Sequence, residues 1–362
     1  MRRASLLVLV VVLGLVGIGC VPPNPGPGGL YLGTQAGIHP AVTPSDRPTT
    51  WGSAPVIDEH YGGTLYAGTP NEMTDPRPAL LAGDREPLRL WVADPNNGVK
   101  DRPAIVWLHG GGFAVGIDSM YQLANGTAKE YAQRGYVGFS VEYRTDTTVI
   151  GSKSLCQWVQ DNEDPNSQTW LNRRQQCMRN IVAAQHDAQA AARYIRAHSS
   201  QYGVDPNKVA VGGFSAGAVT AANLAYRSDD IGTVRYFSDD DLSVANSKVQ
   251  AAIGASGCAY PTGVNDTVPT YIGAGDAPIS FIQAEIDGAV PYQCAATTVK
   301  TARSKGLVAE LRSYCDEQGH ASGLYQAHKA ATDEQWTTFL ARQLDLYSGI
   351  RPASADPTCD QR

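Results

Sequence analysis

Short apolar runs alternate with longer amphipathic stretches along the chain from about residue 62. The run 104–108 is apolar at every position, which is typical of a strand buried on both faces of a sheet. Strands are predicted at 88–92, 104–108, 137–141, 208–211, 249–254, 279–284 and 308–314. Helical patterns cover 119–134, 180–202, 215–227, 291–305 and 332–347. This order predicts an α/β fold with a mostly parallel central sheet, helices on both faces and right-handed crossovers.

The first residues have the pattern of an export signal. Two arginines precede an apolar run of 13 residues, 6–18, which is shorter than the ~20 residues needed to span a bilayer. Small residues before Cys20 suit cleavage there, so residues 1–19 are predicted to be a signal peptide. A lipoprotein signal, in which Cys20 is lipidated, is an alternative, although Gly17 departs from that pattern. Both interpretations predict an exported protein, either secreted or attached to a membrane only through a lipidated N-terminus.

Composition along the chain predicts its domain organisation. Residues 20–60 are rich in Pro, Gly and Thr and are predicted to be a tether followed by an irregular segment. Residues 61–362 are predicted to form a single domain. One polar interval, 145–179, interrupts the alternation of predicted strands and helices and is predicted to be an inserted loop. Loops of that length are either functional or plain surface excursions, and both interpretations stay open.

Charge and cysteine content narrow the function classes. The chain has 29 Lys and Arg against 35 Asp and Glu, a net charge of −6, and so lacks the basic footprint of a nucleic-acid-binding protein. Export favours three disulfides among the cysteines other than Cys20. These six cysteines are Cys156, Cys177, Cys258, Cys294, Cys315 and Cys359. Fifteen disulfide pairings are open among them, and we expect each cysteine to pair with its nearest neighbour in the sequence. Zinc is the competing interpretation, but no Cys-x-x-Cys spacing supports it, and no metal is expected.

The segment 213–217, Gly-Phe-Ser-Ala-Gly, matches the pattern G-x-S-x-G. It follows the predicted strand 208–211 and opens the predicted helix 215–227, which is the strand–turn–helix setting that this motif requires. The two glycines allow the close approach of helix and strand that lifts the hydroxyl of Ser215 off the sheet. The alternative is a serine that merely caps an ordinary helix.

A second motif, His109-Gly-Gly-Gly-Phe113, directly follows the predicted strand 104–108. Three glycines after a strand leave backbone N–H groups uncovered. Such donors stabilise the oxyanion of a tetrahedral intermediate by roughly 3–4 kcal/mol each. A flexible turn is the alternative, but a turn needs one glycine rather than three behind a histidine.

Together these motifs resemble the α/β-hydrolase superfamily, and more narrowly the carboxylesterases and hormone-sensitive-lipase-like esterases. The resemblance runs from about residue 85 to 347 and includes Ser140-Val-Glu-Tyr-Arg144 and Tyr202-Gly-Val-Asp-Pro206. It implies that Ser215 is the nucleophile and that His109 positions its loop rather than acting as the base. It also implies three backbone N–H donors to the oxyanion: Gly111, Gly112 and Ala216.

The same resemblance implies a chain order of serine, then acid, then histidine. Asp287 follows the predicted strand 279–284 and is the expected acid, with Asp266 a distant second; Asp276 lies before the strand, on the wrong side. His320 follows the last predicted strand and is the expected base. His328 falls in a helical stretch, where a packed or exposed histidine is the usual interpretation.

The sequence therefore predicts an exported serine hydrolase that cleaves carboxylic esters through an acyl-enzyme, with a small-molecule or acyl ester as substrate and without a cofactor. A peptidase or amidase on the same fold is the first alternative. A non-catalytic, hydrolase-like binding protein is the second, and the presence of every expected site residue argues against it. Short-chain esters are the default expectation, and the sequence does not select among acyl or alcohol parts.

Overall fold

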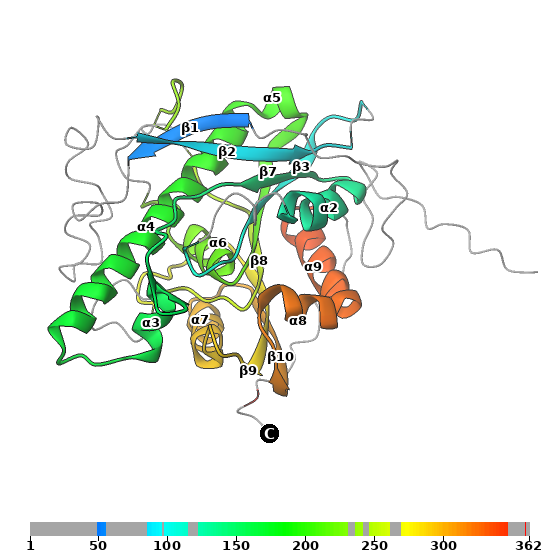
Figure 1. The fold of residues 1–362 in the computed structure, drawn as a ribbon. Helices are drawn as coiled ribbons and strands as arrows, with labels where there is room; N and C mark the ends of the chain where they lie inside the picture. The colour runs from blue at the N-terminus through cyan, green and yellow to red at the C-terminus, as the bar shows by residue number, and fades with distance from the viewer. Residues whose placement is uncertain are drawn as a thin grey trace, which may run out of the picture.

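A computed structural model describes residues 49–55, 85–95, 98–114, 122–230, 236–241, 246–260, 269–346 and 359. Its main sheet has eight strands in the order β1-β2-β4-β3-β7-β8-β9-β10 (Figure 1). These are β1 (Thr49–Pro55), β2 (Arg85–Ala93), β4 (Val137–Val141), β3 (Arg102–Leu108), β7 (Val204–Phe214), β8 (Ala251–Ala255), β9 (Ile279–Ile286) and β10 (Ala309–Gln318). The six neighbouring strands β4, β3, β7, β8, β9 and β10 run parallel to one another. Strand β2 is antiparallel to both β4 and β1. The predicted fold class is confirmed.

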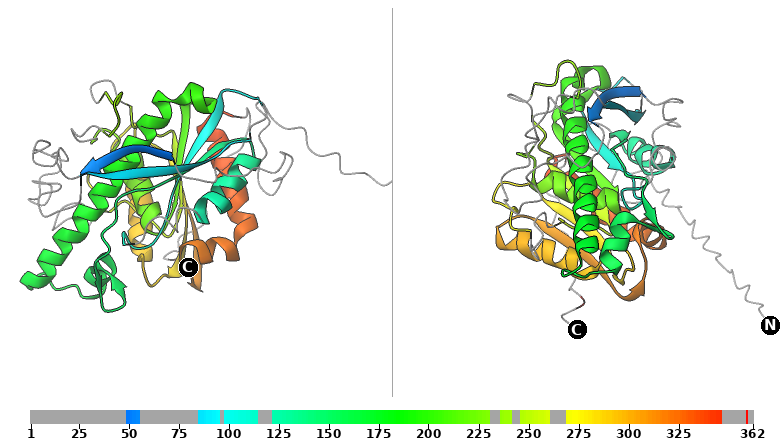
Figure 2. Two further views of the ribbon diagram at one scale, coloured as in Figure 1. Left: turned by 45° about the horizontal axis from the view of Figure 1, so that its top comes forward. Right: turned by 60° about the vertical axis from the view of Figure 1, so that its left-hand side comes forward.

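Helices cover both faces of the sheet (Figure 2). One face carries α4 (Gln168–Ala197), α6 (Ala216–Tyr226) and α7 (Tyr292–Ser304). The other carries the π-helical turn η3 (Ala124–Ala128), α2 (Lys129–Gln133), α8 (Ala321–Ala327) and α9 (Lys329–Gln343). Alternate residues of β3 enter different cores, because Val106 belongs to the first hydrophobic cluster and Trp107 to the second. This double burial explains why the predicted central strands are apolar without interruption.

The N-terminal predictions are tested only in part. Residues 49–55 were expected to be irregular, and that expectation is wrong, because they form β1 and pair with β2 at the edge of the sheet. Backbone hydrogen bonds to a neighbouring strand make an edge strand out of a segment whose composition does not favour one. The predicted signal peptide, Cys20, the tether and most of the irregular segment lie outside the described residues. Within the described residues, no helix is long and apolar enough to cross a membrane.

The interval 145–179 is not a loop, contrary to expectation. It contains a small hairpin, β5 (Val149–Ile150) and β6 (Lys153–Ser154), then α3 (Leu155–Asp161) and the start of α4. Helix α4 begins at Gln168, well before the predicted residue 180, and the Ser167 hydroxyl accepts the N–H of Trp170 at the N-terminus of the helix. It ends at Ala197 and is followed by a short helix, α5 (Ser199–Tyr202). The interval is therefore an ordered excursion that packs against the domain.

Three disulfides join the six cysteines predicted to pair, and the nearest-neighbour arrangement is confirmed. The bonds are Cys156–Cys177, Cys258–Cys294 and Cys315–Cys359. The first joins α3 to α4, so it holds the ordered excursion onto the body of the fold.

Candidate active site

The candidate site lies where the carboxyl ends of the parallel strands meet. Leu108 at the end of β3 pairs with Gly213 of β7, and Phe214 of β7 pairs with Ala255 at the end of β8. Because the strands end together, the loops that follow them share one edge of the sheet. Their side chains therefore come from segments far apart in sequence.

Ser215 sits in a sharp turn between β7 and α6. Its backbone has φ 55° and ψ −122°, which lies outside the regions that L-residues usually occupy. A Cβ on Gly213 would collide with the backbone of Gly217, and a Cβ on Gly217 would collide with the backbone of Leu108. The two glycines of the motif are thus required by close packing, and the turn presents the Ser215 hydroxyl to the site.

The three residues predicted to act together are within hydrogen-bond distance. Ser215 Oγ lies 2.9 Å from His320 Nε2, and His320 Nδ1 lies 2.9 Å from each carboxylate oxygen of Asp287. The Asp287 side chain is fully buried, whereas that of His320 is 35% exposed. Since Asp287 accepts the Nδ1–H, Nε2 is left to accept the hydroxyl proton of Ser215. The arrangement connects a serine, a histidine and a buried carboxylate.

Hydrogen bonds fix the Asp287 carboxylate. It accepts the N–H groups of Ala289 at 2.8 Å and Val290 at 2.9 Å, and the side-chain amide of Gln283 at 3.1 Å. Burial acts to raise the pKa of Asp287, but hydrogen bonds from His320, Ser256, Val290 and Ala289 outweigh it, and the net pKa is lowered. Asp287 therefore remains charged and oriented toward the histidine.

Ser256 is a residue of this site that sequence reasoning missed. It is fully buried directly after β8, with a left-handed φ of 56°. Its hydroxyl oxygen accepts the N–H of Ala321 at 2.8 Å, and its hydroxyl also supports the charged form of Asp287. Ser256 thus links Asp287 to Ala321, the residue that follows His320. Its position two residues after the predicted strand 249–254, at the shared edge, is the signal that would have found it.

The predicted oxyanion loop follows β3. Gly111 and Gly112 have φ values of 112° and 60°, and a Cβ on Gly112 would lie 2.5 Å from Ser154 Oγ, so glycine is required there. Ala216, the third predicted donor, begins α6, where the first N–H groups have no helical carbonyl to bond. The loop glycines, Ser215 and His320 line one cavity.

His109, at the start of the loop, makes no side-chain hydrogen bond to Ser215 or His320, because its Nε2 has no partner among the described residues. Its ring stacks on Tyr143 with a centroid distance of 4.1 Å, and its Nδ1–H donates to the Gly110 carbonyl at 2.7 Å. The Tyr143 hydroxyl donates to the His109 carbonyl at 2.6 Å. Burial lowers the pKa of His109 to about 4, against a smaller opposing effect of the Gly110 hydrogen bond. A neutral, packed histidine thus supports the loop.

Two other sequence candidates, Asp276 and His328, are not brought to the site. Asp276 lies before β9, where its carboxylate accepts the N–H of Gly273 at 2.8 Å. His328 stands between α8 and α9 and pairs with Glu317 at 2.7 Å. Asp266 lies outside the described residues.

Two cavities meet at Ser215. The larger, about 650 Å³, is lined by both polar and apolar groups, the apolar ones including Leu123, Phe214 and Tyr325. Its side chains include Gln122, Thr127, Ser152, Gln157, His320, Ser322 and Gln326. The smaller, about 60 Å³, is lined by apolar side chains on its inner walls: Phe113, Ile181, Ala216, Val219 and Val290. The larger volume falls within the range of small-molecule sites.

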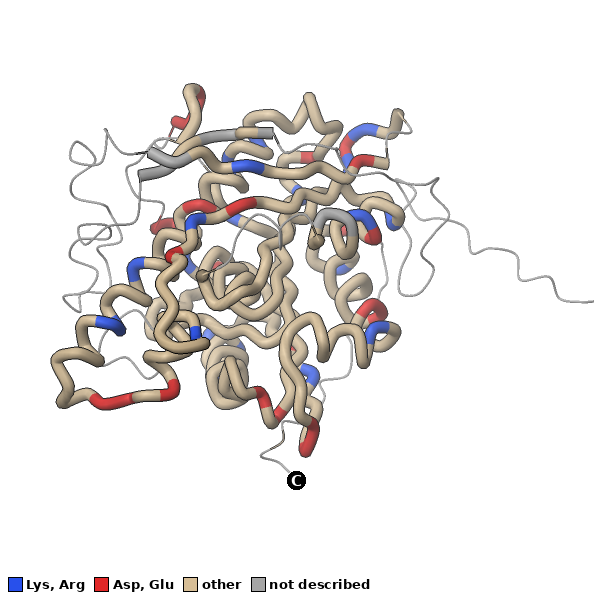
Figure 3. The backbone as a smooth tube through the Cα atoms, in the orientation of Figure 1, with Lys and Arg blue, Asp and Glu red and all other residues tan. Residues whose placement is uncertain are grey.

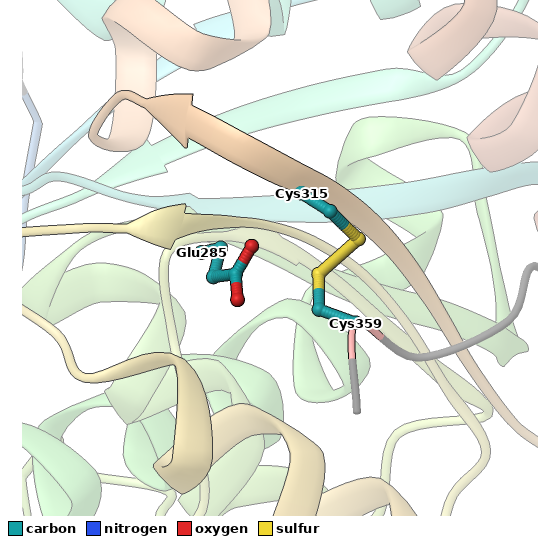
Figure 4. Close-up of side chains that lie close together, drawn as sticks. All are labelled: Glu285, Cys315 and Cys359. Carbon is teal, nitrogen blue, oxygen red and sulfur yellow. A yellow bond between two sulfur atoms is a disulfide. The ribbon is translucent and has the colours of Figure 1, made fainter. Parts of the chain in front are cut away.

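One cluster in the described part of the chain has metal-ligand atoms close together: Glu285, Cys315 and Cys359 (Figure 4). The two sulfurs are bonded to each other, so neither is a thiolate ligand. The Glu285 carboxylate accepts the N–H of Asp316 at 2.7 Å. The cluster is accounted for by a disulfide and a loop hydrogen bond.

Several buried arginines are paired with carboxylates within the fold. Arg144 bonds the Asp187 carboxylate at 2.7 Å with both side chains fully buried, and Arg193 bonds Asp240 at 2.7 Å in the same manner. Figure 3 shows the remaining Lys and Arg of the described residues interspersed with Asp and Glu. In this view they form no continuous basic stripe of the kind that tracks a nucleic-acid backbone.

Comparisons with known proteins agree with this picture. Residues 169–267, which include Ser215, match the family model BD-FAE. The chain is 28% identical over 137 residues to gut esterase 1 of Caenorhabditis elegans and 30% identical over 139 residues to phenmedipham hydrolase of Pseudarthrobacter oxydans. Each match covers 38% of this chain but only 20% and 22% of those relatives, so the chain spans about a fifth of their length.

Similarity in structure extends further along the chain. Propionate-bound esterase 2 of Thermogutta terrifontis superposes with a TM-score of 0.53 at 20% identity, covering 74% of this chain and 93% of the other. The same esterase phosphorylated by paraoxon also has a TM-score of 0.53. These likenesses establish a shared fold.

Proposed function

We propose that this protein, which has the α/β-hydrolase fold, is an exported serine esterase that hydrolyses carboxylic esters through an acyl-enzyme on Ser215. The observation that carries the proposal is the continuous chain of hydrogen bonds from Ser215 through His320 to the buried carboxylate of Asp287. A serine at the end of such a chain is an activated nucleophile.

The proposed reaction begins when His320 Nε2 takes the hydroxyl proton of Ser215 as Oγ attacks the ester carbonyl carbon. Asp287 stabilises the imidazolium and holds its tautomer. The N–H groups of Gly111, Gly112 and Ala216 stabilise the negative charge that develops on the carbonyl oxygen. The tetrahedral intermediate collapses as His320 gives its proton to the departing alcohol, which leaves an acyl group on Ser215.

Deacylation reverses these roles. Water loses a proton to His320 and attacks the acyl carbon, and the released proton then returns to Ser215 Oγ as the carboxylic acid leaves. The lowered pKa of Asp287 supports this cycle, because the acid must stay charged to stabilise the imidazolium twice per turnover.

Relatives with the names esterase, lipase and hydrolase support ester hydrolysis. The neighbouring esterase with propionate or butyrate bound supports short acyl groups as the first substrates to test. The three disulfides support an oxidising compartment. Cleavage after residue 19, with or without lipidation of Cys20, remains our prediction for how the protein is exported.

The test uses the purified mature domain with p-nitrophenyl acetate and butyrate and with matching p-nitroanilides. We expect ester turnover that falls by about 10⁴-fold or more in Ser215→Ala, since the nucleophile of such a unit carries most of the rate enhancement. Ser304→Ala, at the exposed end of α7, is the matched control and keeps wild-type activity. Ser215→Ala with wild-type turnover would refute the proposal, and faster cleavage of anilides than of esters would favour an amidase.

A further inference from the structure

We propose that the smaller cavity holds the acyl group and that α3, anchored by the Cys156–Cys177 disulfide, limits the length of the acyl chain. This inference rests on the proposed function and specifies its substrate. The two cavities both touch Ser215, so an ester bound at this serine extends into each of them. Proton transfer to the departing alcohol determines which cavity holds the alcohol half of the ester and which holds the acyl half.

The departing alcohol must lie on the side of His320, because that histidine donates the proton to the alcohol oxygen. His320 lines the larger cavity and is not among the residues that line the smaller one. The alcohol half of the ester therefore occupies the larger cavity. The acyl half, on the other side of the attacked carbon, points into the smaller cavity beside Ala216.

The lining of the smaller cavity fits a short apolar chain. Phe113, Ile181 and Val219 are each at most 5% exposed and offer only hydrocarbon to an occupant. The volume of about 60 Å³ holds about four to six water-sized groups, at 10–15 Å³ for each. A butyryl group, with about five non-hydrogen atoms, and the shorter propionyl and acetyl groups fit this space, whereas a hexanoyl group, with about seven, does not fit without movement of a wall.

The outer wall is the α3 segment. Ser154, Cys156, Gln157 and Gln160 all line the smaller cavity, and all come from the N-cap and body of α3. The other walls belong to the oxyanion loop, α4, α6, Tyr260 and the segment 289–290. Since α3 lies in the excursion between β4 and α4, its position depends on two buried apolar side chains, Leu155 and Val159, and on the bonds that attach it.

Among the described residues, one disulfide and two hydrogen bonds attach α3 to the rest of the fold beyond the β5–β6 hairpin. The covalent one is the disulfide from Cys156 to Cys177 of α4. The Trp170 indole N–H also donates to the Val159 carbonyl at 2.8 Å, and the Gln157 amide approaches the Gly288 carbonyl at 3.4 Å. Without the disulfide, α3 is held by these weaker contacts and its apolar side chains, so the wall yields to a longer acyl chain.

The test measures kcat/KM for p-nitrophenyl acetate, butyrate, hexanoate and octanoate. In the wild type, we expect kcat/KM to fall by about tenfold or more from butyrate to hexanoate, the discrimination that a pocket of fixed size gives against extra methylenes. The double substitution C156S/C177S removes the cross-link at nearly constant side-chain volume. We expect it to reduce the butyrate-to-hexanoate ratio at least about fivefold. C315S/C359S, which opens a disulfide that lines neither cavity, is the matched control and leaves the ratio unchanged.

A second pair of variants tests the wall without touching a disulfide. Gln160→Ala enlarges the smaller cavity from the α3 side, and Gln326→Ala enlarges the larger one from α8. We expect Gln160→Ala to raise the relative rate on hexanoate, and Gln326→Ala to leave the butyrate-to-hexanoate ratio unchanged. If C156S/C177S does not fold, the butyrate-to-hexanoate ratios of Gln160→Ala and Gln326→Ala test whether α3 limits the length of the acyl chain.

Each failure has a distinct signature. An enzyme that hydrolyses these esters but prefers hexanoate or octanoate overturns the assignment of the smaller cavity. Folded C156S/C177S and Gln160→Ala enzymes with the wild-type ratio overturn the role of α3. Absence of any ester hydrolysis overturns the proposed function itself.

Discussion

Acidification should weaken the fold through His109, which lies behind the glycines of the oxyanion loop. The residue is 1% exposed, and burial lowers its pKa to about 4, whereas an unfolded chain has a histidine pKa near 6.5. Between those values the unfolded state binds the extra proton. The stabilising effect of neutral His109 is therefore complete above about pH 6.5 and is lost as the pH falls toward 4.

The shift gives the size of the effect. At 1.36 kcal/mol for each pH unit, the free energy of unfolding should drop by about 2 kcal/mol between pH 6.5 and pH 5 and by about 3 kcal/mol at pH 4. Carboxylates titrate in the same range, so the comparison requires a variant. His109→Gln keeps a hydrogen-bonding side chain that does not titrate.

Urea unfolding of both proteins at about pH 7 and pH 5 measures the difference. We expect the wild type to lose about 2 kcal/mol more than His109→Gln over this interval, although the variant starts from a lower stability. Equal losses in the two proteins would show that His109 is solvated in the folded state, which would contradict its packing against Tyr143.

Three further substitutions test other parts of the structure. Asp187→Asn leaves the fully buried guanidinium of Arg144 without its charged partner and should lower the free energy of unfolding by about 3–5 kcal/mol in urea titrations. Gly112→Ala forces a Cβ against the hydroxyl that caps α3 and should lower kcat/KM by about 10–100-fold. Gly323→Ala, where an added Cβ meets nothing within 4 Å, is its control and keeps wild-type kcat/KM. Ser256→Ala removes a hydrogen bond to a charged group and should lower kcat about tenfold with little change in KM.

The central strands were predictable because they are buried on both faces. Residues 104–108 and 137–141 are β3 and β4 almost residue for residue. The edge strand β1 was not predictable, because its residues have no apolar pattern of their own and become a strand through pairing with β2. The start of α4 was missed for a related reason, since its polar residues are held as helix partly through a disulfide and a cap.

Some residues of the candidate site were predictable from the sequence and others were not. Ser215, Asp287 and His320 were predictable, because a parallel sheet brings the loops after its strands to one edge and each residue follows a strand. Ser256 obeys the same rule, but a single serine without a motif gives no reason to choose it. The two cavities depend on how α3 packs against the oxyanion loop, and this packing is a property of the folded chain.

The central claim is that Ser215 is the nucleophile. The most direct measurement treats the mature domain with a fluorophosphonate and locates the adduct by peptide mass spectrometry while residual ester hydrolysis is followed. We predict one adduct per chain, on Ser215, that forms in proportion to the loss of activity, and no adduct in Ser215→Ala. Loss of activity without modification of Ser215, or an adduct on another residue that accounts for the loss, would contradict the account.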